Sequence, residues 1–207
     1  MELQYYGANC VRIVTKKAAI TIDDNLADLG LKTVTKAGDI AIFTGPHGIP
    51  KAEVKLVIDT PGEYEVSDIS IRGVGTQAHI DESGQEATVF RLIGEDIRIV
   101  VVGHIYPELN EEQLEKLGTI DVLIIPVGGS GFTLDPLGAL KLIKKIEPKL
   151  VIPTHYADKD IKYAVPQTEL EEALKVLAIE AKETVPKIKL KAGEFSEVTQ
   201  LVVLERQ

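Results

Sequence analysis

The stretch IDVLIIPVGG at residues 120–129 indicates the fold class most directly. Its apolar run 121–126 is nearly continuous, which is typical of a strand that helices cover on both faces of a sheet. Helical patterns flank this strand at 110–118 and 135–146, and a further short apolar strand is predicted at 150–152. This alternation of strands and helices predicts an α/β protein.

The predicted helices have recognisable ends. Asn110 is a typical N-cap, Gln113 is placed to reach back to it, and Gly118 is a typical stop. Pro136 follows Asp135 at the position where proline favours the first helical turn. The last third of the chain adds a third amphipathic helix and two closing strands, predicted at 167–177, 187–190 and 199–204.

The first half of the chain consists of short segments rich in Val and Ile, separated by turn residues such as Gly45-Pro46. We expect these segments to be strands, at 3–6, 11–14, 18–22, 40–43, 55–58, 69–72, 88–92 and 97–102. Strands early and helices later predict a four-layer αββα sandwich, with helices outside a two-sheet core, in one domain over residues 1–207. Periodicity alone leaves a doubly wound single sheet open.

Composition narrows the class of ligand. Lys and Arg total 23 against 32 Asp and Glu, a formal charge of −9, and no basic stripe interrupts this acidic balance. We therefore expect a small-molecule substrate and no nucleic acid partner. Cys10 is the single cysteine, which excludes an internal disulfide. Without a leader pattern or an apolar run of spanning length, we expect a cytoplasmic protein with no membrane partner; oligomeric state stays open.

The four histidines share a position in the predicted fold. His47, His79, His104 and His155 each follow a predicted strand. Loops at the carboxyl ends of strands are where layered α/β folds place ligands, and imidazole is the commonest protein ligand of zinc. Four imidazoles could complete one tetrahedral site, or three could leave a position for water. Any one loop histidine taken alone is more often a solvated or hydrogen-bonded side chain.

Several blocks along the chain together resemble the metallo-β-lactamase superfamily. They are YGANC at 6–10, ID at 22–23, PGEYEV at 61–66, GVGTQAH at 73–79, GHIYPEL at 103–109, IDVLIIPVGG at 120–129, TLD at 133–135 and VIPTHY at 151–156. Within the superfamily they look most like the branch of ascorbate-phosphate-lactonase-like proteins, usually described as zinc-dependent hydrolases. The resemblance covers nearly the whole chain and implies the αββα fold.

The metal signature of that family, His-x-His-x-Asp-His, is degenerate in this sequence. The matching stretch is 45–50, where His47 keeps the second histidine. Gly45, Ile49 and Pro50 stand where the family has a histidine, the aspartate and the last histidine. The resemblance therefore implies that a two-metal site of the usual kind is lost.

The other family positions imply one metal ion. His79 and His155 match two further histidine ligands, and His104 stands where the family has a metal-bridging aspartate. A set of His47, His79, His104 and His155 is neutral and suits a single divalent transition metal such as zinc. If His104 stays off the metal, it could serve as a general acid or base.

Other polar residues near these blocks are weaker candidates. Asp23 and Asp81 are the nearest replacements for the missing general base, although Asp23 could equally hold a loop by hydrogen bonds. Asp135, with Thr133 before it, is best interpreted as a helix cap. The glycine-rich loop 128–131 could receive an anionic substrate group through its amides.

Two function hypotheses from different classes follow. The first is a single-metal hydrolase in which the ion activates water against a lactone, ester or phosphoester. The second is a non-catalytic descendant that keeps the fold as a metal-binding or interaction scaffold, which the broken signature favours. A nuclease is a third possibility, and the acidic balance argues against it.

Overall fold

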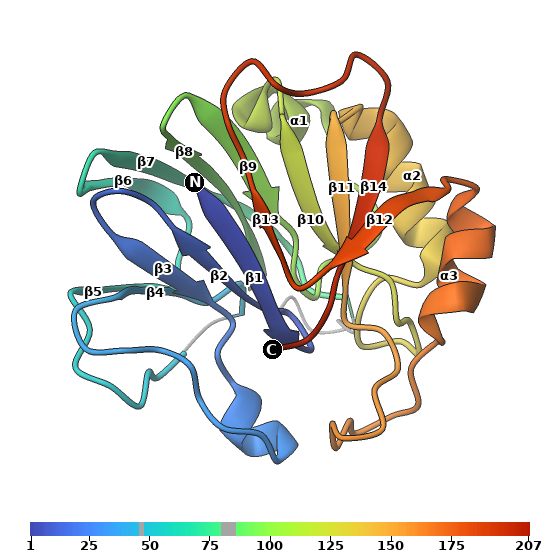
Figure 1. Cartoon of the computed structure of the whole chain (residues 1–207), viewed down its shortest axis with the longest axis horizontal. Coiled ribbons are helices and arrows are strands. Elements are labelled where there is room, and N and C mark those ends of the chain that lie inside the picture. Colours follow the sequence, from blue (N-terminus) through green and yellow to red (C-terminus); the bar gives the residue numbers. More distant parts are fainter. Residues whose placement is uncertain (46–47, 80–85) are drawn as a thin grey trace.

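The computed structural model describes residues 1–45, 48–79 and 86–207, which form two β-sheets packed face to face (Figure 1). Helices α1 (Glu111–Leu117), α2 (Pro136–Ile146) and α3 (Leu170–Leu177) lie along the outer face of the larger sheet. Two sheets with helices outside confirm the predicted fold class. None of the helices in the described ranges combines the length and the hydrophobicity that crossing a membrane requires.

The smaller sheet has the order β13-β1-β2-β3-β4-β5 within the described residues. Its strands β3, β4 and β5 are parallel to one another, and its other neighbours are antiparallel. The bounds are Glu2–Gly7 for β1, Cys10–Val14 for β2, Ala19–Ile22 for β3, Ile40–Ile42 for β4, Leu56–Ile58 for β5 and Lys187–Lys189 for β13.

The larger sheet has the order β12-β14-β11-β10-β9-β8-β7-β6. Strands β6 to β9 form an antiparallel meander, and β9, β10, β11, β14 and β12 are parallel. The bounds are Gly62–Val66 for β6, Ile69–Gln77 for β7, Glu86–Gly94 for β8, Ile97–Val101 for β9, Val122–Pro126 for β10, Leu150–Thr154 for β11, Ala181–Val185 for β12 and Gln200–Leu204 for β14.

Alternating side chains of the larger sheet divide between two apolar cores. Ile99 and Ile124 face the smaller sheet, where they join Leu3 and Ile20. Val100 and Leu123, one position away on the same strands, face the helices instead. This explains why the run 122–126 is apolar throughout: each of its side chains is buried.

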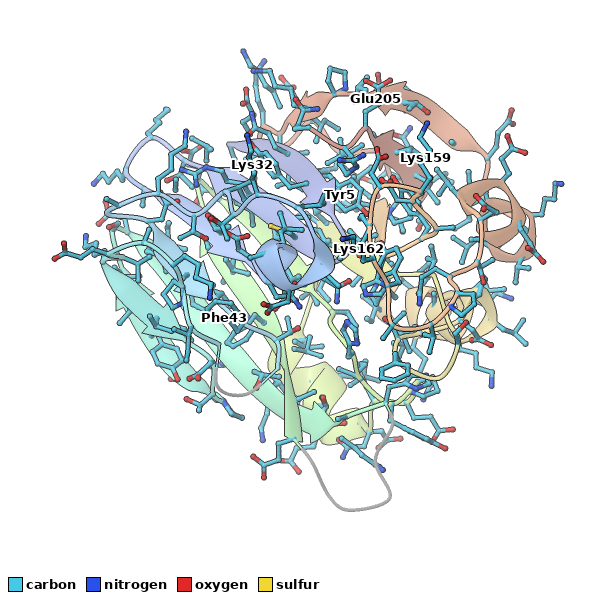
Figure 2. All side chains as sticks on the ribbon, turned by 90° about the horizontal axis from the view of Figure 1, so that it is seen from below. Tyr5, Lys32, Phe43, Lys159, Lys162 and Glu205 are labelled. Atoms are coloured by element: carbon cyan, nitrogen blue, oxygen red, sulfur yellow. The ribbon has the colours of Figure 1, made fainter. Side chains whose placement is uncertain are left out.

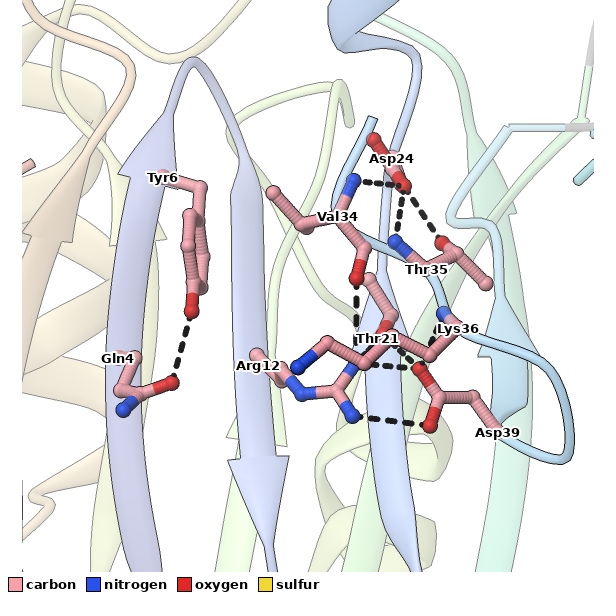
Figure 3. A network of polar contacts seen from close by, with 9 residues as sticks. All are labelled: Gln4, Tyr6, Arg12, Thr21, Asp24, Val34, Thr35, Lys36 and Asp39. Atoms are coloured by element: carbon pink, nitrogen blue, oxygen red, sulfur yellow. Dashed lines mark hydrogen bonds and ion pairs between the residues drawn. The ribbon is translucent and has the colours of Figure 1, made fainter. Parts of the chain in front are cut away.

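The outer face of the smaller sheet is covered by the segment 23–39, which contains the 3₁₀ helix η1 (Leu26–Leu29). Arg12, on β2, pairs with both carboxylate oxygens of Asp39 and also donates from Nη1 to Thr21 Oγ1 at 3.0 Å and to the Val34 carbonyl at 3.3 Å (Figure 3). This network ties the covering segment to the strands beneath it. On this side, a 3₁₀ helix and a loop held by polar contacts take the place of the expected helical layer.

A few elements differ from the sequence-based expectation. The PGEYEV block forms strand β6, which was not predicted. The segment Ala181–Val185 pairs with β14 as a strand, although its sequence has no alternation of apolar and polar residues that would predict one. Helix α3 begins at Leu170 and not at residue 167, because Thr168 N donates to the Gly128 carbonyl at 2.8 Å and holds the chain extended there.

Candidate metal centre

The described histidines lie together at one end of the sandwich. His79, His104 and His155 follow β7, β9 and β11, which run in the same direction, so their carboxyl ends meet at one edge. The rings of His104 and His155 are 4.8 Å apart between centroids and nearly perpendicular, at 85°. The backbone amide of His79 donates to the His104 carbonyl at 3.0 Å. His47 lies outside the described residues.

Each of these three imidazoles is held by a protein oxygen. Nδ1 of His79 lies 3.0 Å from the Gly131 carbonyl oxygen, and Nδ1 of His155 lies 3.1 Å from Gln167 Oε1. His104 makes a hydrogen bond to the Phe132 backbone. Because an oxygen acceptor requires the ring nitrogen to carry the proton, the other nitrogen of a neutral ring keeps its lone pair. This orientation by an outer partner is typical of metal-binding histidines.

Burial keeps two of the rings neutral. Desolvation lowers the pKa of His155 to about 4, with a further contribution from nearby His104. Desolvation and the proximity of His79 also lower the pKa of His104, against the effect of its hydrogen bond to Phe132. Neutral imidazole is the form that binds metals, so both rings are in the binding form at neutral pH.

Two glycines make room for the residues that orient the site. A Cβ on Gly128 would lie 1.9 Å from the His155 carbonyl oxygen and 2.2 Å from Gln167 Oε1. A Cβ on Gly103 would lie 1.9 Å from Thr44 Oγ1. Sequence reasoning missed Gln167 and Thr44, because the glycines that make room for them are distant in the chain.

Asp23 occupies the position of a loop anchor. Its Oδ1 accepts from the Thr44 backbone amide and its Oδ2 from Thr44 Oγ1, both at 2.7 Å. Burial raises the pKa of Asp23 to about 6, against the effect of these hydrogen bonds. The carboxylate also lines the cleft described below, so its predicted catalytic role stays a prediction. Asp81, the other predicted base, lies outside the described residues.

The glycine-rich loop presents one carbonyl oxygen to the histidine cluster and another to the segment before α3. Gly131 accepts from His79, as described above, and Gly128 accepts from Thr168 N. Asp135 caps α2 by accepting from Gly138 N at 2.7 Å, which confirms its interpretation as an N-cap. The described contacts of this loop therefore position side chains of the site.

His104 and His155 open into a cleft of about 610 Å³ between the two sides of the sandwich. Figure 2 views this end of the molecule, with Phe43 of the smaller sheet on one side and Lys162 of the loop after β11 on the other. His104, His155 and Tyr163 contribute to its wall, and the Tyr163 ring lies 5.0 Å from that of His155. The volume is sufficient for a small-molecule substrate.

The three histidines have the chemistry of metal ligands. Three imidazoles, each oriented by an oxygen acceptor, suit a borderline divalent cation. Within residues 1–45, 48–79 and 86–207, however, no group of three His, Cys, Asp or Glu side chains is already arranged to hold one. The chemistry of the residues fits a metal, and His47, which the family resemblance implies as a further ligand, lies outside the described residues.

Fold and site together define a two-sheet α/β sandwich protein with a histidine-lined cleft at one end. Residues 2–155 match the family described as the beta-lactamase superfamily domain, and the chain belongs to that family. This confirms the resemblance to the metallo-β-lactamase superfamily.

Similar proteins extend this assignment. A structure from Thermotoga maritima, assigned to the Zn-dependent hydrolases of the metallo-β-lactamase superfamily, is 25% identical with a TM-score of 0.78, covering 100% of this chain and 99% of that one. The metallo hydrolase Igni18 from Ignicoccus hospitalis is 17% identical with a TM-score of 0.60, covering 86% and 90%, and shows the fold alone.

Shorter matches connect the chain to curated relatives. It is 42% identical over 43 residues to a UPF0173 metal-dependent hydrolase of Carboxydothermus hydrogenoformans, covering 21% of this chain and 19% of that protein. It is 49% identical over 45 residues to one of Nanoarchaeum equitans, covering 22% and 20%. The matched segment spans about a fifth of each relative.

Proposed function

We propose that this protein is a metal-dependent hydrolase that uses one divalent ion, zinc by the chemistry of its ligands. The observation that carries the proposal is the convergence of His79, His104 and His155, each with one ring nitrogen tied to an oxygen acceptor. His47 is the proposed fourth ligand. The names of similar proteins support the same class of activity.

The substrate class is a lactone, ester or phosphoester small enough for the cleft. A divalent ion held by these imidazoles supplies Lewis-acid activation of water and of the bond to be cleaved. Gln167, Gly131 and Phe132 fix the ring orientations, and Phe43 and Phe132 add apolar surface to the cleft. Asp23 is the proposed base, acting from its anchored position beside Thr44.

The first test is elemental analysis of untagged protein, because a tag would add histidines of its own. About one equivalent of a transition metal is expected, and it should be lost in His155→Ala and kept in Lys175→Ala, an exposed position on α3. Turnover of a panel of lactones, esters and phosphoesters should disappear on chelation and return with metal.

His104 has two proposed roles that the same experiment separates. If His104 is a ligand, His104→Ala should lose the metal along with turnover. If it moves a proton, His104→Ala should keep the metal and lose turnover, with a changed pH profile.

The non-catalytic scaffold remains the second candidate function, and two observations favour it. The described residues contain no preformed three-ligand group, and the signature positions Gly45, Ile49 and Pro50 lack ligand side chains. Protein that binds metal tightly but turns over none of the panel would establish the scaffold and contradict the hydrolase.

A further inference from the structure

Two buried polar side chains on the wall of the cleft have unpaired atoms. Asn9, in the turn between β1 and β2, is 4% exposed, and Asp24, after β3, is 6% exposed. Both side chains line the cleft. Among the residues that the structure describes, neither Asn9 Nδ2 nor Asp24 Oδ1 has a hydrogen-bond partner. A buried donor and a buried acceptor without partners are costly, which points to a ligand that supplies them.

The remaining atoms of both side chains are fixed. Asn9 Oδ1 accepts from Thr154 Oγ1 at 3.3 Å, so the amide presents its nitrogen elsewhere. Asp24 Oδ2 accepts from the backbone amides of Val34 and Thr35 at 2.8 and 2.7 Å, which leaves Oδ1 as the unpaired oxygen (Figure 3). The unpaired atoms are therefore one defined donor and one defined acceptor.

The strand register brings the two residues near each other. Strands β2 and β3 are antiparallel, with Val11 opposite Ile22. Asn9 precedes β2 by one residue and Asp24 follows β3 by two, so both lie at the same end of this pair. Both residues therefore line the cleft from the same end of this strand pair.

The charge of the cleft selects the kind of molecule. Its described lining includes four carboxylates and one lysine, namely Asp23, Asp24, Asp28, Glu86 and Lys51. Such a wall attracts cations and N–H donors and repels phosphate groups, especially around Asp24, whose charge is buried.

We propose that Asn9 and Asp24 form a recognition site for an amino or amide group of the substrate. An N–H of that group donates to Asp24 Oδ1, and a neighbouring carbonyl oxygen accepts from Asn9 Nδ2. This inference rests on the proposed hydrolase function and narrows its substrates to esters and lactones that carry an ammonium or amide group, in preference to phosphoesters.

The test is binding of glycinamide to the full chain in the presence of a chelator, followed by ¹H–¹⁵N NMR. Glycinamide offers an ammonium group beside a carbonyl, acetamide lacks the charge, and malonamate replaces it with a carboxylate. The side-chain amide signal of Asn9 should shift, and affinity should fall in the order glycinamide, acetamide, malonamate. Equal affinity for the three probes, or no shift at Asn9, would overturn the proposal.

Two variants locate the site. Asp24→Asn keeps an oxygen for Val34 and Thr35 but places NH₂ at the unpaired position, so glycinamide should bind about tenfold more weakly. Asp96→Asn, at an exposed position outside the cleft, is the control and should change affinity little. If Asp24→Asn unfolds, Asn9→Asp tests the other half: it keeps the acceptor for Thr154 and should weaken acetamide binding.

Binding and turnover separate the two proposals. Glycinamide binding at Asn9 without turnover of any substrate would contradict the hydrolase and leave the recognition site standing. Turnover with no preference for amino or amide substrates would contradict the recognition site alone.

Discussion

The two outer faces of the sandwich are covered in different ways. Helices α1, α2 and α3 cover the larger sheet through apolar side chains such as Leu117, Leu142 and Leu177. The segment 23–39 covers the smaller sheet through buried polar contacts centred on Arg12. The helices over the larger sheet can be predicted from apolar periodicity in the sequence. The polar contacts of the segment 23–39 cannot, because they join residues that are distant in the chain.

The largest expected effect comes from breaking the polar cover. Arg12→Ala leaves the carboxylate of Asp39 buried without its partner, since both side chains are less than 10% exposed. We expect a loss of about 3–5 kcal/mol in the free energy of unfolding, measured by urea denaturation. The exposed pair Lys17–Asp68 is the control, and Lys17→Ala should change stability by less than about 1 kcal/mol.

A double substitution sharpens this result. Arg12→Met with Asp39→Leu removes both charges together and should recover most of the lost stability, because no unpaired charge stays buried. If the double variant is as unstable as Arg12→Ala, the hydrogen bonds to Thr21 and Val34 contribute more than the ion pair does.

The apolar cover should respond to loss of volume. Leu142 on α2 is fully buried against the larger sheet. Leu142→Ala removes three buried carbons and leaves a cavity, with an expected cost of about 2–4 kcal/mol in the same denaturation experiment. Leu137→Ala, on the same helix but 54% exposed, should cost less than about 1 kcal/mol. Equal effects of the two variants would contradict the assignment of this helix face.

The contrast explains how much could be predicted from the sequence. The buried strand at 121–126 and the capped helices were found because each has a local signal, as the Asn110–Gln113 capping box shows. The third helix was predicted to start early, since the contact between Thr168 and Gly128 is not visible in its local pattern. Strand β12 was missed because its exposed residues have no apolar period.

The residues of the candidate site likewise include some that could be predicted from the sequence and some that could not. Strand directions bring His79, His104 and His155 to one edge, as their positions after strands predicted. Gln167, Asn9 and Asp24 were not predicted, because their importance comes from burial and from which atoms are already paired. Such information depends on side-chain geometry, which residue spacing does not contain.

Protonation on the two sides of the cleft should have opposite effects on the free energy of unfolding. His155, on the larger sheet, has its folded pKa lowered to about 4, so the unfolded chain binds more protons and acid destabilises the fold. Asp23, on the smaller sheet, has its folded pKa raised to about 6, so the folded protein binds more protons and acid stabilises it. Between about pH 6 and 4 the two contributions oppose each other.

Asp23→Asn tests this compensation. The variant keeps an oxygen acceptor for Thr44 but loses the titration, so its stability should fall more steeply than that of the wild type between pH 6 and 4. One uncompensated proton gives a slope of about 1.4 kcal/mol per pH unit. Urea denaturation across this range measures it, and parallel curves for the two proteins would contradict the prediction.

The smallest expected effect concerns the helix ends of the two covers. Asp135 caps α2 through its bond to Gly138 N, whereas Asn25, at the corresponding position of η1, makes no side-chain cap. Asp135→Ala should therefore cost about 1 kcal/mol and Asn25→Ala only a few tenths. Thermal denaturation resolves this difference. A larger effect at Asn25 would mean that the polar cover depends on its 3₁₀ turn as well as on Arg12, and that the two covers are less different than their contacts indicate.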